Sequence, residues 1–143
     1  MRNLILNLAF LLLPVLCMGQ NEGVIGRWYT EHRAGIVEVY VENGILNGKL
    51  ISLAEPVDEN GQPKKDVKNK DKALRNRPLT GVFILKDLKQ DGNEWKGGKV
   101  YDPESGNTYN CTVKPEKGML NVRGSIGPFG RTTKWEAVPA EVK

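Results

Sequence analysis

The chain has 143 residues, about the length of one domain. With 39% hydrophobic and 27% charged residues, its composition is that of an ordinary globular domain. This excludes a disordered tail, a collagen-like rod and a polytopic membrane protein. The formal net charge is +4, but basic and acidic residues alternate along most of the chain. Nucleic-acid-binding proteins more often gather their cations into one stripe with stacking aromatic residues, so we expect no nucleic-acid partner.

The N-terminal residues have the pattern of a secretory signal peptide. Arg2 precedes an apolar run from Leu4 to Leu16, and Gly19 is the small residue that precedes a signal-peptidase cut. The run is shorter than the roughly 20 apolar residues that cross a bilayer. We therefore predict cleavage after Gly19, so that residues 1–19 are removed. The mature protein (residues 20–143) is then one domain without a transmembrane segment, in the periplasm or secreted.

Cys17 offers an alternative, in which the chain is a lipoprotein acylated at this residue. We disfavour it because Leu16 is larger than the residue that usually precedes a lipidated cysteine. Removal of Cys17 leaves Cys111 as the only cysteine, so no internal disulfide can form. The single histidine, His32, is far from Cys111 in the sequence, and we interpret Cys111 as a buried core residue.

From Gly26 onward, apolar and polar residues alternate with a period of two, and turn residues interrupt the alternation at short intervals. This pattern is typical of an all-β sandwich or barrel. Asn43-Gly44 predicts a tight hairpin because both residues tolerate positive φ, and residues 102–107 predict a turn around Pro103. We predict eight strands, at residues 27–32, 36–42, 45–53, 82–85, 94–101, 108–114, 119–126 and 132–137.

All links between these strands are short except residues 54–80. Sequential strands joined by tight turns usually pair with their neighbours, and eight of them can close so that no edge is exposed. We therefore predict an all-β fold, an eight-stranded antiparallel meander closed into a barrel, with one long loop between the third and fourth strands. A two-sheet sandwich is the competing architecture, but residues 127–130 are too few for the long return of a Greek key.

The long loop contains the densest polar cluster of the sequence. Asp66, Asn69 and Asp71 could supply oxygen ligands, but the spacing, glycine and terminal glutamate of a calcium loop are missing, so we expect no metal. We expect Asn69 and Asp71 to hold local turns, with Asp71 capping one helical turn, and Arg75 or Arg77 to tie the loop to the barrel. A loop of this length can also act as a lid or a binding segment.

Aromatic and cationic side chains share strand faces in the second half of the chain, where they could line a cavity for an anionic or amphipathic ligand. Equally, these faces could point to water, and the pattern does not decide which way the fifth and seventh strands face. Trp95, Lys99 and Tyr101 alternate along one strand, as do Tyr109 with Cys111 and Met119 with Arg123. The candidate ligand contacts are Trp95, Lys99, Tyr101, Tyr109, Arg123 and Arg131.

Motifs of catalysis are missing from the sequence. No His/Cys cluster has zinc spacing, no glycine-rich loop has phosphate-binding form, and Gly-x-Ser-x-Gly does not occur. Asp102 and Glu104 flank Pro103 in a turn, where carboxylates are usually solvated. We therefore expect neither an enzyme nor a cofactor; a hydrolase would depend on Asp102 or Glu104.

Blocks of residues in a fixed order resemble a known family. They are Gly26-x-Trp28, Val37-Glu38-Val39-Tyr40, Gly48-Lys49-Leu50, Asn69-x-Asp71-x-x-Leu74-Arg75-x-Arg77-Pro78-Leu79-x-Gly81, Trp95-x-Gly97-Gly98-x-Val100-Tyr101-Asp102-Pro103-x-x-Gly106-x-x-Tyr109, Leu120-x-Val122-Arg123-Gly124 and Gly130-Arg131-x-x-x-Trp135. Together, over Gly23 to about Ala137, they resemble the bacterial domain-of-unknown-function family 2147 (DUF2147), small exported proteins with a lipocalin-like (calycin) barrel. Lys70 stands where that family usually has proline, which should loosen the loop. The family has no established activity, so the resemblance implies fold and export but no catalytic residue.

The resemblance also implies a structural role for Trp28. In lipocalin-type barrels, a Gly-x-Trp on the first strand closes one end of the barrel with its indole, often beneath a cation from the last strand. We therefore expect Trp28 to plug the base of the barrel, with Arg131 or Lys134 over its ring.

We predict a monomeric exported barrel that binds a small amphipathic or anionic molecule, with residues 54–80 packed over one side or end. The alternative is an envelope structural or protein-interaction module whose barrel is fully packed and binds no ligand. The interior volume separates the two, because a ligand pocket encloses roughly 300 Å³ or more.

Overall fold

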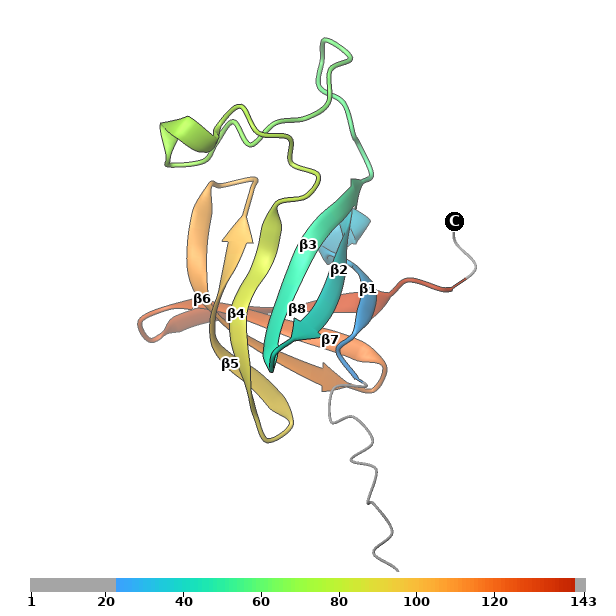
Figure 1. The fold of residues 1–143 in the computed structure, drawn as a ribbon, viewed down its shortest axis with the longest axis vertical. Coiled ribbons are helices and arrows are strands. Elements are labelled where there is room, and N and C mark those ends of the chain that lie inside the picture. Colours follow the sequence, from blue (N-terminus) through green and yellow to red (C-terminus); the bar gives the residue numbers. More distant parts are fainter. Residues whose placement is uncertain (1–22, 141–143) are drawn as a thin grey trace, which may run out of the picture.

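The computed structural model describes residues 23–140, which form a closed barrel of eight antiparallel strands (Figure 1). Each strand pairs with the next, and β8 returns to β1 through the pairs Trp28–Ala137 and Tyr29–Glu136. The predicted eight-stranded antiparallel barrel is therefore confirmed. The strands are β1 (Gly26–Tyr29), β2 (Gly35–Glu42), β3 (Ile45–Leu53), β4 (Phe83–Asp91), β5 (Glu94–Asp102), β6 (Asn107–Glu116), β7 (Met119–Ile126) and β8 (Phe129–Ala137).

The predicted signal peptide and Cys17 lie outside the described residues. Within residues 23–140 the chain also forms two short 3₁₀ turns, η1 (Glu31–Arg33) and η2 (Lys72–Leu74). Among residues 23–140, no helix has the length and hydrophobicity that spanning a membrane requires.

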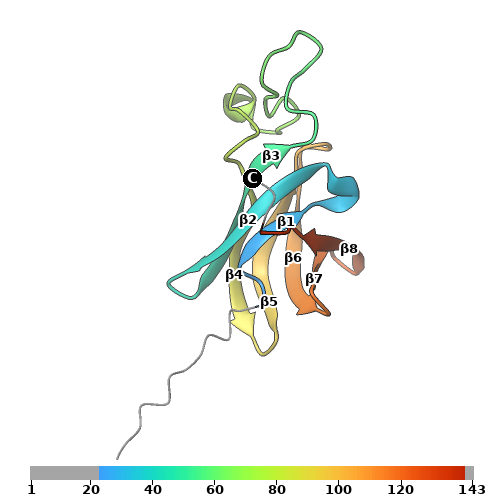
Figure 2. The same cartoon turned by 90° about the vertical axis from the view of Figure 1, so that its right-hand side faces the viewer.

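Because neighbouring strands run in opposite directions, their connections alternate between the two ends of the barrel. Three tight hairpins, at residues 43–44, 92–93 and 117–118, form the end that we call the base. At the first of these, Asn43 and Gly44 have φ of 52° and 76°, the positive values predicted for this hairpin. The other end, which we call the mouth, carries η1, the long loop and the turns at residues 103–106 and 127–128; the long loop extends beyond the strands there (Figure 2).

Three predicted strand limits were wrong. β4 extends to Asp91 rather than ending at residue 85, because a bulge at Asp87, with φ of 61°, interrupts the alternation between buried Leu85 and Leu88. β1 ends at Tyr29, since His32 adopts a φ of 57° within η1. β8 begins at residue 129, because the β7–β8 turn is shorter than predicted.

Large side chains fill the barrel toward its base. Trp95 is paired with Val113 and Leu120 with Trp135, and all four are buried. Gly98 lets neighbouring strands close over this core: a Cβ there would lie 2.2 Å from the carbonyl oxygen of Lys86. The base half of the interior therefore has no room for a ligand.

Trp28 belongs to the same core. Its side chain is buried, and its indole Nε1 donates a hydrogen bond of 2.9 Å to the carbonyl of Val24, two residues before β1 at the base. The expected cation over this ring is wrong: within residues 23–140, the cation–π contacts are Arg33 over Tyr29, and Lys49 and Lys86 over Phe83. Apolar packing and one hydrogen bond hold the indole.

Replacement of Trp28 by alanine should therefore lower the free energy of unfolding by about 3–5 kcal/mol, because it removes a large buried ring and leaves a cavity. Urea unfolding followed by circular dichroism measures this loss. Trp28→Phe is the matched control: it keeps most of the apolar volume and should lose much less. A Trp28→Ala variant as stable as the parent would show that the indole does not close the base.

Candidate functional site

A cavity of about 1440 Å³ opens at the mouth of the barrel. Its inner wall is apolar and includes Leu50, Val100, Val122 and Trp135 from four different strands. Its outer part lies between the strand ends, η1 and the long loop, which contributes residues from Ala54 to Leu79. The barrel is thus filled at its base and hollow at its mouth.

Residue size along β8 helps to explain why the cavity lies toward the mouth. Thr133 lines the cavity, whereas Trp135, two residues nearer the base on the same face, is a large buried ring. On β7, Gly124 lets Val100 and Tyr109 lie close to the strand: a Cβ there would be 3.3 Å from Val100 and 3.4 Å from Tyr109, so a larger residue would press on the cavity wall.

Charged side chains surround the cavity in balanced numbers. Arg131 forms an ion pair with Glu31 of η1, and Lys64 forms one of 3.5 Å with Glu55 in the long loop. The cationic or titratable basic residues that line the cavity are His32, Lys64, Lys65, Lys68 and Arg131, and the acidic residues are Glu31, Glu55, Asp58, Asp102 and Glu104. The rim is therefore strongly polar, but its mixed charges do not form a cationic site specific for anions.

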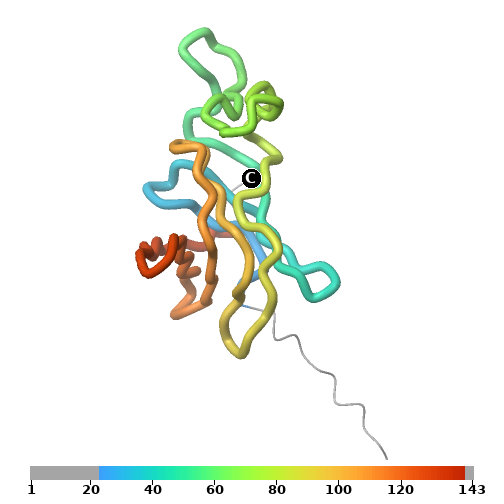
Figure 3. The backbone as a smooth tube through the Cα atoms, turned by 90° about the vertical axis from the view of Figure 1, so that its left-hand side faces the viewer, coloured from blue at the N-terminus to red at the C-terminus, as the bar shows by residue number. Residues whose placement is uncertain are grey.

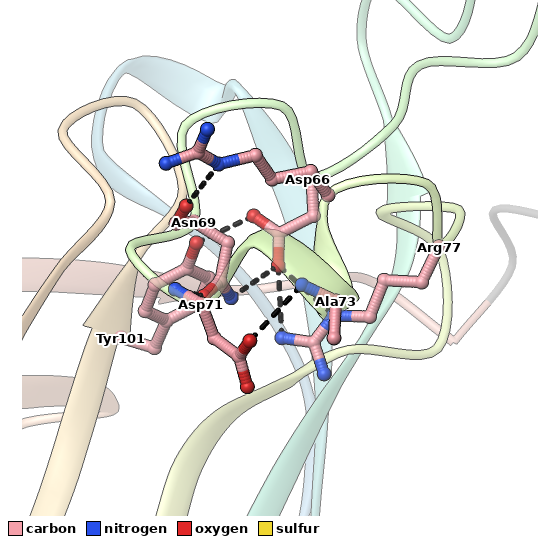
Figure 4. A network of polar contacts seen from close by, with 7 residues as sticks. Asp66, Asn69, Asp71, Ala73, Arg77 and Tyr101 are labelled. Carbon is pink, nitrogen blue, oxygen red and sulfur yellow. Dashed lines mark hydrogen bonds and ion pairs between the residues drawn. The ribbon is translucent and has the colours of Figure 1, made fainter.

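The long loop is fastened to the barrel by the buried carboxylate of Asp66 (Figure 4). One oxygen, Oδ2, accepts hydrogen bonds from Asn69 Nδ2 at 2.8 Å and Arg77 Nε at 2.9 Å. The other, Oδ1, accepts from the hydroxyl of Tyr101 on β5 at 2.5 Å. We call Asp66, Asn69, Arg77 and Tyr101 the loop clasp, since it satisfies a buried charge and joins the loop to a strand.

The predicted loop anchors lie in or beside this clasp. Asn69 accepts a hydrogen bond from the backbone N–H of Asp71 at 2.8 Å, and Asp71 caps η2 by accepting from Ala73 N at 3.0 Å. Arg75 Nε donates to the carbonyl of Asn69 at 2.7 Å. The sequence predicted that an arginine would tie the loop to the barrel; instead Asp66 contacts Tyr101 on β5, and Arg77 compensates the charge of Asp66.

A glycine in the β5–β6 turn lets the loop lie against the barrel. Gly106 has a φ of 73°, and a Cβ there would lie 1.9 Å from the carbonyl oxygen of Lys68. Any other residue at this position would push the loop away. The cover over the mouth is therefore held at two points, the clasp and this backbone contact.

Burial raises the pKa of two groups, Tyr101 at the cavity and Cys111 in the core of the barrel. Burial raises the pKa of Tyr101 to about 12, and its hydrogen bond to the negative Asp66 acts in the same direction. Burial also raises the pKa of Cys111 to about 12, so its thiol stays protonated and unreactive near neutral pH.

Of the six candidate ligand contacts, the structure places Tyr101, Tyr109 and Arg131 along the cavity. Trp95 is buried in the base half, whereas Lys99 and Arg123 are exposed. Lys99 lies on the outer face, where its Nζ donates to Asn110 Oδ1 at 2.5 Å.

A bulge in β5 explains why Trp95 and Lys99 do not share a face, contrary to the expectation from alternation. Trp95 is opposite Val113 while Gly98 is opposite Cys111, so β5 has one extra residue in this stretch. Gly97, with φ of 76°, occupies the bulge. The cavity residues that sequence analysis missed, Val122 and Thr133 among them, alternate regularly along β7 and β8. That alternation marks one face but does not show which face is inside.

Of the two carboxylates proposed for a hydrolase, that of Asp102 shapes a turn. Asp102 Oδ1 accepts from the backbone N–H of Glu104 at 3.0 Å, and its Oδ2 accepts from Ser105 Oγ at 2.6 Å. These contacts give Asp102 a structural role in the β5–β6 turn.

A closed eight-stranded meander, filled at one end and hollow at the other, defines a lipocalin-like barrel. The family model described as an uncharacterised protein conserved in bacteria (DUF2147) matches residues 26–137, and the chain belongs to this family. The chain is also similar to a solved structure, protein HP1028 from Helicobacter pylori, described as belonging to the lipocalin family. The two are 29% identical with a TM-score of 0.71, over 82% of this chain and 84% of that chain. A search of curated proteins finds no match.

The loop clasp makes a prediction about stability and pH. Tyr101→Phe removes the only barrel donor to Asp66 among the described contacts and should cost about 1–3 kcal/mol at neutral pH. Because the folded pKa of Tyr101 is raised from 10.0 to about 12, the parent's advantage should be complete below pH 10 and shrink as the pH rises toward 12. Urea unfolding of both proteins across this range measures the difference.

Tyr40→Phe is the matched control, because within residues 23–140 the Tyr40 hydroxyl makes no hydrogen bond and its removal should change little. The clasp would be refuted if Tyr101→Phe and Tyr40→Phe had the same stability, or if the difference between parent and Tyr101→Phe stayed constant through the alkaline range.

Proposed function

We propose that this protein binds one small amphipathic molecule in the cavity at the mouth of its barrel. The observation that carries the proposal is the cavity itself: about 1440 Å³ is ample for a small-molecule ligand, since ligand pockets typically measure roughly 300–1,000 Å³. A fully packed structural module has no physical reason to keep an apolar-lined cavity of this size between its barrel and its long loop.

The distribution of polarity favours an amphipathic ligand over a simple anion. An apolar segment would lie against Leu50, Val100 and Val122 in the inner part of the cavity, while a polar head would remain among the charged residues of the rim. Arg131 and Tyr109 are suitably placed to contact that head. Because acidic and basic residues are balanced there, the rim gives no strong preference for negative charge.

We further propose that the protein acts outside the cytoplasm as a monomer and without catalysis. The apolar run from Leu4 to Leu16, followed by Gly19, supports export, and the family is described as conserved in bacteria. The local hydrogen bonds of Asp102 weigh against its use as a catalytic acid or base. The likeness to a lipocalin-family structure is consistent with ligand binding, but one fold supports many functions.

Filling the cavity tests the proposal. Thr133 lines the cavity on β8, and Thr133→Phe places an aromatic ring in that space. Binding of a neutral apolar dye such as Nile red, followed by fluorescence, should weaken by roughly tenfold or more, because the ring occupies volume that the ligand needs.

Thr132→Phe is the matched control. Thr132 is the next residue on the same strand but is exposed on the outer face, opposite Arg123, so the same change there should leave dye binding intact. Equal dye binding by the two variants, or no binding by the parent, would contradict a ligand site at the mouth.

A further inference from the structure

The hairpin between β7 and β8 carries an exposed apolar tip. Phe129 is 79% exposed, the highest value among the large hydrophobic residues of the described chain, and Ile126 is 62% exposed. The two residues are paired across the hairpin, so their side chains lie on the same face. The tip stands out from the side of the barrel wall (Figure 3). We call Ile126, Gly127, Pro128 and Phe129 the apolar tip.

The turn makes this tip rigid. Only Gly127 and Pro128 separate the paired residues, and Gly127 has a φ of 55°. Glycine at positive φ followed by proline, whose ring holds φ near −65°, matches a type II′ hairpin turn. Little conformational entropy would therefore be lost when the tip docks on another surface.

A guanidinium lies behind the tip on each face of the hairpin. On the inner face of the hairpin, Arg131 follows Phe129 by two residues along β8 and forms an ion pair with Glu31. On the outer face, Arg123 packs against Gly130, where a Cβ would lie 2.5 Å from its guanidinium nitrogen. Within residues 23–140, Arg123 is exposed and has no acidic partner. The exposed apolar side chains of the tip therefore lie beside one unpaired positive charge, that of Arg123.

We propose that the apolar tip docks the protein on an anionic phospholipid surface. Phe129 and Ile126 would enter the boundary between headgroups and acyl chains, and Arg123 would pair with lipid phosphates, which the planar guanidinium suits. Each basic residue near an anionic bilayer contributes about 1 kcal/mol of attraction.

Size and charge favour a lipid surface over a protein partner. A stable protein interface buries roughly 1,600 Å² in total, far more than two side chains on a narrow projecting turn can supply. A second copy is disfavoured because the Arg123 guanidinium groups beside two facing tips would repel each other. A bilayer does not need a large contact area, because two apolar side chains can insert into it. An anionic bilayer also attracts the positive charge of Arg123.

The proposal is independent of the proposed ligand, because docking needs no occupant in the cavity. If both hold, the geometry connects them: Ile126 and Phe129 also line the cavity at its rim. Docking by the tip would then place this part of the cavity rim next to the bilayer.

Vesicle flotation tests the proposal with protein purified from cells that express the full chain. We expect binding to vesicles of phosphatidylglycerol and phosphatidylcholine in equal parts, little binding to phosphatidylcholine alone, and a decrease as salt is raised. Ile126→Ser and Phe129→Ser should each weaken binding roughly tenfold, because each removes a large apolar side chain from the bilayer contact. Arg123→Gln should weaken it roughly fivefold.

Two matched controls make the test specific. Ile25 is 53% exposed at the base, so Ile25→Ser removes the same side chain from the opposite end and should bind like the parent. Lys134→Gln removes one exposed positive charge from β8 farther from the tip and should have less effect than Arg123→Gln. All variants share the same N-terminal residues, so any contribution of that segment to flotation cancels.

Three results would overturn the proposal. They are equal binding by Ile126→Ser and Ile25→Ser, equal binding of the parent to charged and neutral vesicles, and a concentration-dependent dimer that Phe129→Ser abolishes. The last would assign the tip to a second copy of the chain. None of these outcomes bears on whether a dye enters the cavity, so failure here and failure of the proposed function remain distinguishable.

Discussion

Closure of the sheet is the constraint on which the rest of this structure depends. Eight antiparallel strands that pair in a ring enclose an interior of nearly fixed width, and only the inward-facing side chains decide whether it is filled. Here the base half is filled by residues such as Trp95 and Leu120, whereas smaller residues such as Thr133 line a cavity toward the mouth. The cavity is therefore a consequence of residue size along the barrel axis. It requires no rearrangement of the strands.

The loop over the mouth is held in place by a few specific contacts. A buried carboxylate is expensive unless it is paired and hydrogen-bonded, and the side chain of Asp66 is satisfied by partners from both the loop and β5. Releasing the loop would break the hydrogen bond between Tyr101 and Asp66, so the clasp favours the arrangement in which the loop lies against β5. Together with the close approach of Gly106 to Lys68, this makes the cavity largely preformed. A preformed site loses less entropy on binding than one that must be assembled.

Much of the fold could be predicted because its signals are local. The hairpin at Asn43-Gly44 and the regular alternation of β3 and β7 each depend on a few adjacent residues, and the structure agrees with them. The bulges at Asp87 and Gly97 shift every later residue of their strand to the other face, and nothing in the alternation marks them. This is why Trp95 and Lys99 were wrongly placed together. The role of Asp66 was also missed, since it depends on Tyr101, a residue far away in the sequence that the fold brings into contact.

The central claim is that the mouth half of the barrel is a site that a small molecule occupies. Native mass spectrometry of the protein purified gently from its own cells tests this most directly. We expect a discrete mass in excess of the processed chain, released on denaturation and absent from Thr133→Phe but retained by Thr132→Phe. Repeated recovery of the bare chain from the parent, with no retained small molecule under any gentle condition, would contradict it.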